Sequence, residues 1–489
     1  MVKGKKLVKN LTAVILSGII TVSLSGTVFA RGMSLQESIT EALNNNRSIK
    51  QEEASVEKSK AVLGEAQGER GVALTWTGSV SKLGGHYYNE QNIDHSYGNE
   101  IAASLPIYTG GQLENNVKSA KLGVEISSLT LENEKQSIEL QTIQDYYSIL
   151  NYQNIKKVDA SAVEQYNEHL RVANAKYSAG VVPKSDVLEA EVNLANAQQS
   201  LVSGDNNLQV AITNFNKLIG QDLMTDVEPS DDYLTDTDFS KTIQECMDEA
   251  VQNRPDGIAA KKTVEQAQAA IAEAKAGYLP QVSAVASKTI AGDNMLNNDQ
   301  SDKSLVGLQA SWDIFDSNVT HSKVAQAQAS LAAAQQQQAD TDDQIRLDVR
   351  QAYLSMEAAR KNINTTKTAV AQAAENNRIA EVRYQAGVGT NSDRLDAISY
   401  YITAQMNYNQ ALYDYTTSKA ALYKAMGMSS ESIAQDIAQA TGSASTAADT
   451  EKTADAGLTA SNVEQITNAG EENNSSELNP LDRGAGQTD

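Results

Sequence analysis

The stretch Tyr177-Ser-Ala-Gly-Val-Val-Pro-Lys-Ser-Asp-Val-Leu-Glu-Ala190 occurs a second time as Tyr384-Gln-Ala-Gly-Val-Gly-Thr-Asn-Ser-Asp-Arg-Leu-Asp-Ala397. The two copies lie 207 positions apart (384 − 177), and the same spacing relates Tyr146 to Tyr353. One spacing that holds across separated segments indicates tandem duplication of a structural unit. The predicted boundaries are 31–227 for the first repeat, 228–241 for a linker and 242–428 for the second repeat.

A long helical hairpin is predicted in each repeat. Residues of about 112–178 and about 319–385 contain no proline, so each segment can form one uninterrupted helix. At 1.5 Å per residue, a helix of about 67 residues is roughly 100 Å long, which exceeds the width of an ordinary globular domain. Gly180 and Gly387 follow these segments and can adopt the left-handed conformation that ends a helix. The returning helices are expected to begin at residue types that cap N-termini: Ser185, Asp186, Ser392 and Asp393.

Ahead of its hairpin, each repeat is expected to contain one helix followed by two strands. Apolar and polar residues alternate in four short segments, as in strands that present one apolar face. The expected strands span about 73–83, 96–108, 281–290 and 304–315. Their apolar face carries Leu74, Trp76, Ile101, Leu105, Leu308 and Trp312. Adding 207 to Ile101 and Leu105 gives Leu308 and Trp312, so this face has kept its phase through the duplication.

The length of these strands suits a lipid bilayer, because a tilted strand of about 9–11 residues crosses one. Four strands cannot close a barrel, and every unpaired backbone group at a lipid-exposed edge costs several kcal/mol. If the apolar face contacts lipid, several copies of the chain must therefore share one barrel. The alternative is a small soluble sheet between coiled coils.

The composition excludes several functions. The chain has 62 acidic and 40 basic residues and a net charge of −22, which disfavours nucleic acid as a partner. Its one cysteine, Cys246, excludes an internal disulfide framework, and its histidines are too dispersed for a metal site. We find no phosphate-binding loop and no catalytic constellation, so we expect no cofactor and no enzymatic activity. The four histidines are His86, His95, His169 and His321.

The two ends of the chain differ from the repeats. Residues 1–30 have the layout of a signal peptide, with basic residues near Lys3, an apolar stretch from Leu11 to Leu24 and small residues at Val28 and Ala30. Residues 429–489 are rich in small and polar residues with scattered acids, a composition typical of disordered segments. We therefore expect export of the chain and a disordered acidic tail.

Taken together, these features resemble the TolC-like outer-membrane efflux and secretion channels. The resemblance rests on the two repeated turn motifs, on Gly277-Tyr278-Leu279-Pro280 before the third strand, and on Leu105-Pro-Ile-Tyr-Thr-Gly-Gly111 after the second. It implies a fold that is mainly α with transmembrane β, in which three copies share a twelve-stranded barrel in the outer membrane. A long periplasmic α-helical barrel would continue it.

The resemblance also implies partners and a site. Such channels dock onto a periplasmic adaptor protein and an inner-membrane transporter, and they serve multidrug efflux or type I secretion without performing chemistry. In the family, inward-facing aspartates near the hairpin turns ring the periplasmic entrance. The matching residues are Asp393 and Asp396, with Asp186 and Glu189 as their counterparts in the first repeat.

Two alternatives stay open on the sequence alone. Asp393 and Asp396 lie three apart and share a helix face, so copies around an axis would form a cation-selective constriction. They could instead be ordinary helix-start acids, which the helix dipole and capping favour. For the whole chain, the rival to an export duct is a soluble periplasmic coiled-coil scaffold or adaptor without a pore.

Overall fold

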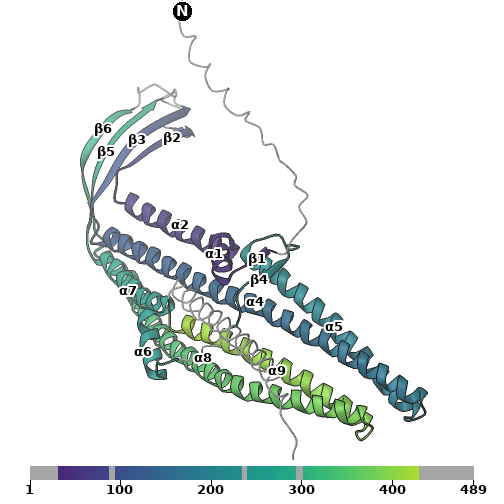
Figure 1. Cartoon of the computed structure of the whole chain (residues 1–489). Helices are drawn as coiled ribbons and strands as arrows, with labels where there is room; N and C mark the ends of the chain where they lie inside the picture. The colour runs from purple at the N-terminus through teal and green to yellow at the C-terminus, as the bar shows by residue number, and fades with distance from the viewer. Residues whose placement is uncertain (1–30, 87–93, 234–238, 293–300, 429–489) are drawn as a thin grey trace, which may run out of the picture.

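The computed structural model describes residues 31–86, 94–233, 239–292 and 301–428. The expected signal peptide (1–30) and acidic tail (429–489) lie outside the described residues. Figure 1 shows an elongated molecule with a curved sheet at one end and two long helical hairpins that run away from it. Both hairpin turns lie at the end opposite the sheet.

The two repeats have the same order of elements. In the first, they are α1 (Leu35–Asn45), α2 (Arg47–Gly68), β2 (Ala73–Lys82), β3 (His95–Tyr108), α4 (Gln112–Ser178) and α5 (Lys184–Ile219). In the second, they are α6 (Ile243–Asn253), α7 (Pro255–Lys275), β5 (Gln281–Gly292), β6 (Ser301–Ser311), α8 (Val319–Gln385) and α9 (Asn391–Ala425). A 3₁₀ turn at Ala276–Tyr278 precedes β5.

The helix ahead of the strands is divided in two in each repeat, whereas the sequence analysis expected one. Asn46 ends α1 and caps α2, because its side chain accepts a hydrogen bond from the backbone N–H of Ser48 at 2.8 Å. In the second repeat, Pro255 is the first residue of α7, where its missing N–H costs no helical hydrogen bond. Both breaks therefore come from residues that favour the start of a helix.

The long helices α4 and α8 each contain 67 residues. Gly180 and Gly387 follow them with φ values of 74° and 75°, a left-handed conformation that a residue with a Cβ adopts at a cost. The returning helices begin within one or two residues of the expected positions, at Lys184 and Asn391, but the predicted capping residues were wrong. Pro183 and Thr390 occupy the cap positions, so the four predicted capping residues lie inside the first turns.

The four long strands form one antiparallel sheet in the order β2-β3-β5-β6. Trp76 pairs with Ile101, and Leu105 pairs with Ala284, which in turn pairs with Leu308. Directly paired residues point to the same side of a sheet, and residues two apart share a face. The five apolar residues at 74, 76, 101, 105 and 308 therefore share one face.

Trp312 does not belong to this strand face. Strand β6 ends at Ser311, four residues before the expected end at 315, and β5 continues to Gly292 rather than stopping at 290. The indole N–H of Trp312 donates a hydrogen bond to the carbonyl oxygen of Tyr278 at 3.1 Å. This contact attaches Trp312 to the turn between α7 and β5.

The sheet and the layer of helices each have two outer edges, and these edges lie on the same two sides of the molecule. Strands β2 and β6 each pair on one side, so each forms an edge of the sheet. Helix α4 packs against α2 and α5 of its own repeat and against α7 and α9 of the other, whereas α8 packs mainly against α6, α7 and α9. Helix α8 therefore lies at one margin of the helical layer, and α2 with α5 lies at the other (Figure 1).

The main apolar core lies midway along the hairpins, where a short parallel pair of strands joins the chain ends of the first repeat. Strand β1 (Arg31–Met33) pairs with β4 (Val227–Pro229), so the predicted linker at 228–241 begins inside a strand. Residues 234–238 of that linker lie outside the described part of the chain. Buried tyrosines from α4 and Phe215 from α5 fill this core.

None of the described helices combines the length and the apolar character needed to cross a membrane.

Two neighbouring tyrosines in this core allow a matched test of the hydrogen bonds that attach α4 to the backbone at β1 and β4. The hydroxyl of Tyr146 lies 2.9 Å from the carbonyl oxygen of Met33 and accepts hydrogen bonds from the backbone N–H groups of Ser230 and Asp231, each at 3.1 Å. The hydroxyl of Tyr147 is also buried but has no partner among the described residues. We predict that Tyr146→Phe lowers the free energy of unfolding by about 1–3 kcal/mol.

The control is Tyr147→Phe, which removes an unpaired buried hydroxyl and is expected to leave stability unchanged or to raise it. Denaturant unfolding followed by circular dichroism measures both. Equal losses of stability in the two variants would show that the hydrogen bonds of the Tyr146 hydroxyl do not stabilise the fold.

A second test concerns a buried carboxyl group on α4. Glu139 is fully buried, and neither of its oxygens has a hydrogen-bond partner among the described residues. Burial raises the pKa of Glu139 from 4.5 to about 8, with a smaller contribution from the charge of Glu132. The unfolded chain loses this proton near pH 4.5, so folding stability falls as the pH rises from there through about 8.

We predict that Glu139→Gln raises the free energy of unfolding at pH 8 by on the order of 2–4 kcal/mol, and that it has little effect at pH 4. Thermal unfolding at the two pH values measures this difference. Glu65→Gln, at an exposed position of α2, serves as the control and should change stability at neither pH. A Glu139→Gln variant with the same pH dependence as the parent would refute the assignment.

Candidate functional site

The candidate site is the contact between the two hairpins near their turns, where the last turns of α4 and α8 meet. The ammonium group of Lys176 donates a hydrogen bond to the carbonyl oxygen of Tyr384 and lies 4.0 Å from the centre of its ring. The ring of His169 lies 5.0 Å from the same tyrosine ring, centre to centre. Burial, with a smaller contribution from the charge of Asp186, raises the pKa of Tyr384.

Asn391, the first residue of α9, connects three helices at this contact. Its side chain is buried, its Oδ1 lies 2.8 Å from Nε2 of His169 on α4, and its Nδ2 donates to the carboxylate of Glu189 on α5 at 2.8 Å. Because an amide oxygen only accepts, Nε2 of His169 carries the proton. The two hairpins are therefore joined through a neutral amide.

A second set of polar contacts lies next to the first. Buried Arg394 on α9 donates to the side chain of Asn377 on α8, and its guanidinium group lies 3.6 Å from the carboxylate of Glu381. Asn377 in turn donates to the side-chain oxygen of Gln165 on α4 at 3.0 Å. Apolar side chains of both hairpins pack beside this set: Ala162, Tyr166, Ala197, Leu395 and Ile398.

The four carboxylates predicted from the sequence have different surroundings. Asp393 forms a capping box, because its backbone N–H donates to the Thr390 hydroxyl at 3.0 Å and its carboxylate accepts from the Thr390 N–H at 3.2 Å. These bonds lower the pKa of Asp393. Asp396 is exposed one turn further along α9, and Asp186 is half-buried in the first turn of α5. Glu189 accepts a hydrogen bond from Asn391 of the other hairpin.

Sequence reasoning missed the roles of His169 and Asn391, two buried residues of this contact. The sequence analysis treated His169 only as one of four scattered histidines, and it treated Asn391 only as a residue of the second turn motif, without a partner. The sequence contains one weak signal for Asn391. The equivalent position of the first repeat, 207 residues earlier, is Lys184, so the two turns differ at this position. That difference marks the position without indicating its partner, which lies 222 residues away along the chain.

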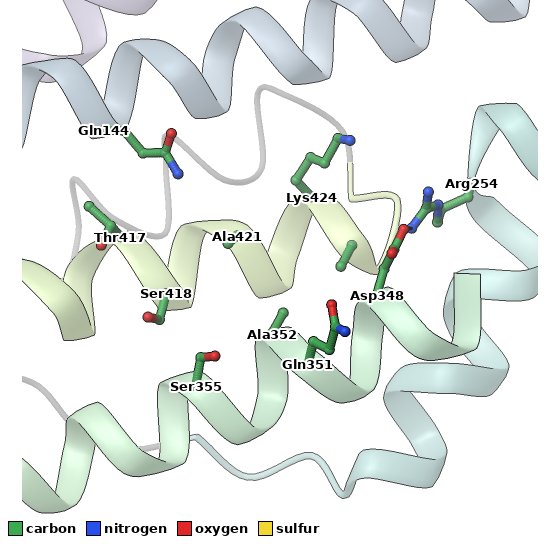
Figure 2. A pocket seen from close by; sticks show the side chains of 11 residues that line it. Gln144, Arg254, Asp348, Gln351, Ala352, Ser355, Thr417, Ser418, Ala421 and Lys424 are labelled. Carbon is green, nitrogen blue, oxygen red and sulfur yellow. Dashed lines mark hydrogen bonds and ion pairs between the residues drawn. The ribbon is translucent and has the colours of Figure 1, made fainter. Parts of the chain in front are cut away.

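Elsewhere, a cavity of about 360 Å³ lies between the middle of α8 and the last turns of α9 (Figure 2). Buried Arg254 at its edge pairs with Asp256 at 2.7 Å and Asp348 at 3.0 Å, which ties the start of α7 to α8. Burial lowers the pKa of Lys424, which also lines this cavity. The described residues contain no cluster of side chains that could hold a metal ion.

The sequence model of the outer membrane efflux protein family matches residues 38–221 and 246–428, which covers both repeats. The fold therefore belongs to the class of outer-membrane efflux channels. The chain is a member of the outer membrane efflux protein family and an outer-membrane protein.

Individual relatives agree with this assignment. The outer membrane efflux protein BepC of Brucella suis is 24% identical over 433 residues, which is 86% of this chain and 91% of BepC. The outer membrane protein TolC of Escherichia coli is 23% identical over 318 residues, 63% of this chain and 64% of TolC. The structure of the Campylobacter jejuni CmeC outer membrane channel aligns with a TM-score of 0.72 at 19% identity, over 83% of this chain and 89% of CmeC. The expected TolC-like fold is thus confirmed.

The capping role of Asp393 can be separated from any role of Asp396. We predict that Asp393→Ala lowers the free energy of unfolding by about 1 kcal/mol, because the backbone N–H of Thr390 loses its partner. Asp396→Ala removes an exposed carboxylate outside the cap and should change stability by less than about 0.5 kcal/mol. Denaturant unfolding of the two variants checks this, and equal effects would contradict the capping role.

Proposed function

We propose that the chain forms the exit duct of a multidrug efflux pump or a type I secretion system. In this proposal it is a passive conduit, without enzymatic activity or cofactor, coupled to an inner-membrane transporter through a periplasmic adaptor protein. The observation that carries the proposal is that the sheet and the helical layer have unpaired edges on the same two sides. Strand β6 and helix α8 form one edge, and strand β2 with helices α2 and α5 forms the other. Family membership supports the same reading.

The internal duplication indicates how copies would join. Within the chain, β3 of the first repeat pairs with β5 of the second, and α4 of the first packs against α7 and α9 of the second. Strand β6 and helix α8 are the second-repeat counterparts of β3 and α4, while β2, α2 and α5 are the counterparts of β5, α7 and α9. The same contacts can therefore form between copies, with β6 and α8 of one chain against β2, α2 and α5 of the next.

Such contacts are head-to-tail and close into a ring if the rotation fits. Exposed apolar side chains at both margins suit this packing: Val192, Val202 and Val210 on α5, and Leu347, Leu354 and Val382 on α8. We propose three copies, which would give twelve strands around one barrel. The helices would then enclose a periplasmic tunnel.

The apolar sheet face would contact outer-membrane lipid. Leu74 is 73% exposed, Trp76 66% and Leu308 73%, and their neighbours in the register are apolar or small over most of this face. A water-exposed sheet would not gain from such a face, which speaks against the rival proposal of a soluble periplasmic coiled-coil scaffold or adaptor without a pore.

Fractionation of cells that express the chain tests the proposal directly. We expect the protein in the outer-membrane fraction, extractable only with detergent, as an oligomer that dissociates on heating. Analytical ultracentrifugation of the detergent-solubilised protein should give three copies per particle. A monomer that stays soluble without detergent would exclude the exit duct and favour the soluble scaffold.

A channel also allows a test of the predicted carboxylate ring. In a three-fold assembly, Asp393 and Asp396 would place six carboxylates around the entrance, a site that attracts cations. We predict that Asp396→Ala lowers the preference for cations and weakens block by multivalent cations in single-channel recordings. Glu65→Ala, at an exposed position of α2, is the control and should leave both properties unchanged. Unaltered conductance, selectivity and block in Asp396→Ala would exclude the ring.

A further inference from the structure

We propose that His169 and Asn391 form an acid-sensitive latch that holds the two hairpin turns together. Protonation of His169 would weaken the contact and separate the turns. The proposal rests on the proposed function in one respect, because separation of the turns would widen the tunnel entrance only in a channel. The latch itself is a property of one chain.

The surroundings of His169 do not stabilise a charged imidazole. His169 is 3% exposed and lies between the two hairpins, with its Nε2–H donated to Asn391. A second proton would go to Nδ1, for which the described contacts provide no acceptor. The positive charge would therefore be buried without a hydrogen bond of its own, which is the costly way to bury a charge.

The groups that face His169 add to this cost. Among the groups whose charges act on His169, Lys176 on its own helix and Arg394 on α9 are cations and Glu189 on α5 is a carboxylate. Tyr384 on α8 presents its ring, and the charge of Asp186 on α5 acts on Tyr384. Glu189 already accepts from Asn391, and Lys176 already lies over the Tyr384 ring, the surface that could otherwise stabilise an imidazolium. A charged His169 would thus be repelled by two cations and attracted by one carboxylate.

The sign of the pH effect follows from this environment. Burial, the largest cause, lowers the pKa of His169 below its ordinary value of 6.5, against the smaller opposite effect of the bond to Asn391. With the turns apart, the imidazole is hydrated and binds its proton near the ordinary value. Acid therefore favours separated turns, by up to tenfold for each pH unit between the two pKa values, and the latch holds above about pH 6.5.

Distance measurement within one chain tests the latch. Spin labels at Ser178→Cys and Gln385→Cys occupy exposed, equivalent positions at the ends of α4 and α8, in a Cys246→Ser background. Doubly labelled chains are diluted with unlabelled chains so that the distance between labels of one chain dominates in electron–electron double resonance. We expect a single short distance at pH 7.5 and a growing longer component as the pH falls from 6.5 to 5.

Three substitutions separate the latch from general effects of acid. His169→Gln keeps an N–H donor for Asn391 but cannot titrate, so its distances should not change between pH 7.5 and 5. His169→Arg carries a permanent charge and should show the longer component already at pH 7.5. His321→Gln, an exposed histidine at the opposite end of α8, should respond to pH as the parent does.

The outcomes distinguish this proposal from that of the exit duct. A parent protein without pH-dependent distances, or a His169→Gln variant that responds to acid as the parent does, would overturn the latch even if the protein conducts ions. Absence of conductance at every pH would count against the duct and would leave the distance result standing. Circular dichroism of each variant at both pH values verifies that the helices remain folded.

Discussion

Backbone hydrogen bonding at the margins of the sheet is the constraint on which the rest of the structure depends. Strands β2 and β6 each offer one row of N–H and C=O groups that no other strand of the described residues pairs. Water can satisfy such groups, but hydrocarbon cannot, and the apolar face of the sheet is suited to hydrocarbon. The duplication supplies a solution, because the contact between the repeats can be repeated between copies. The helices have the same open margins, so one interface would extend from the sheet to the hairpin turns.

The hairpins are held together differently along their length. Near β1 and β4, tyrosines, Phe215 and aliphatic side chains form a large apolar core, in which the hydroxyl of Tyr146 bonds to backbone groups. Near the turns, the core shrinks to a few small or medium side chains, and the contact depends on buried polar groups around Asn391 and Arg394. Polar contacts that include a titratable side chain respond to protonation, whereas contacts between apolar side chains do not. The end of the hairpins that would form the entrance is therefore also the more easily separated end.

Local signals in the sequence predicted much of the fold. The absence of proline followed by Gly180 or Gly387 located the long helices, and alternation located one face of the sheet, because these rules involve neighbouring residues. Features that depend on distant partners were not predictable. The pairing of β1 with β4, the attachment of Trp312 to Tyr278 and the contact of His169 with Asn391 each join residues more than thirty positions apart. For the same reason Glu189 was singled out as a carboxylate near a turn, but its bond to Asn391 required the structure.

Hydrogen exchange of the protein in lipid nanodiscs tests the central claim most directly. The account predicts that the outward-pointing backbone amides of β2 and β6 exchange as slowly as those of β3 and β5, since neighbouring copies would pair them. Fast exchange along β2 and β6, beside slow exchange in β3 and β5, would show that the edges remain unpaired and would contradict the shared barrel.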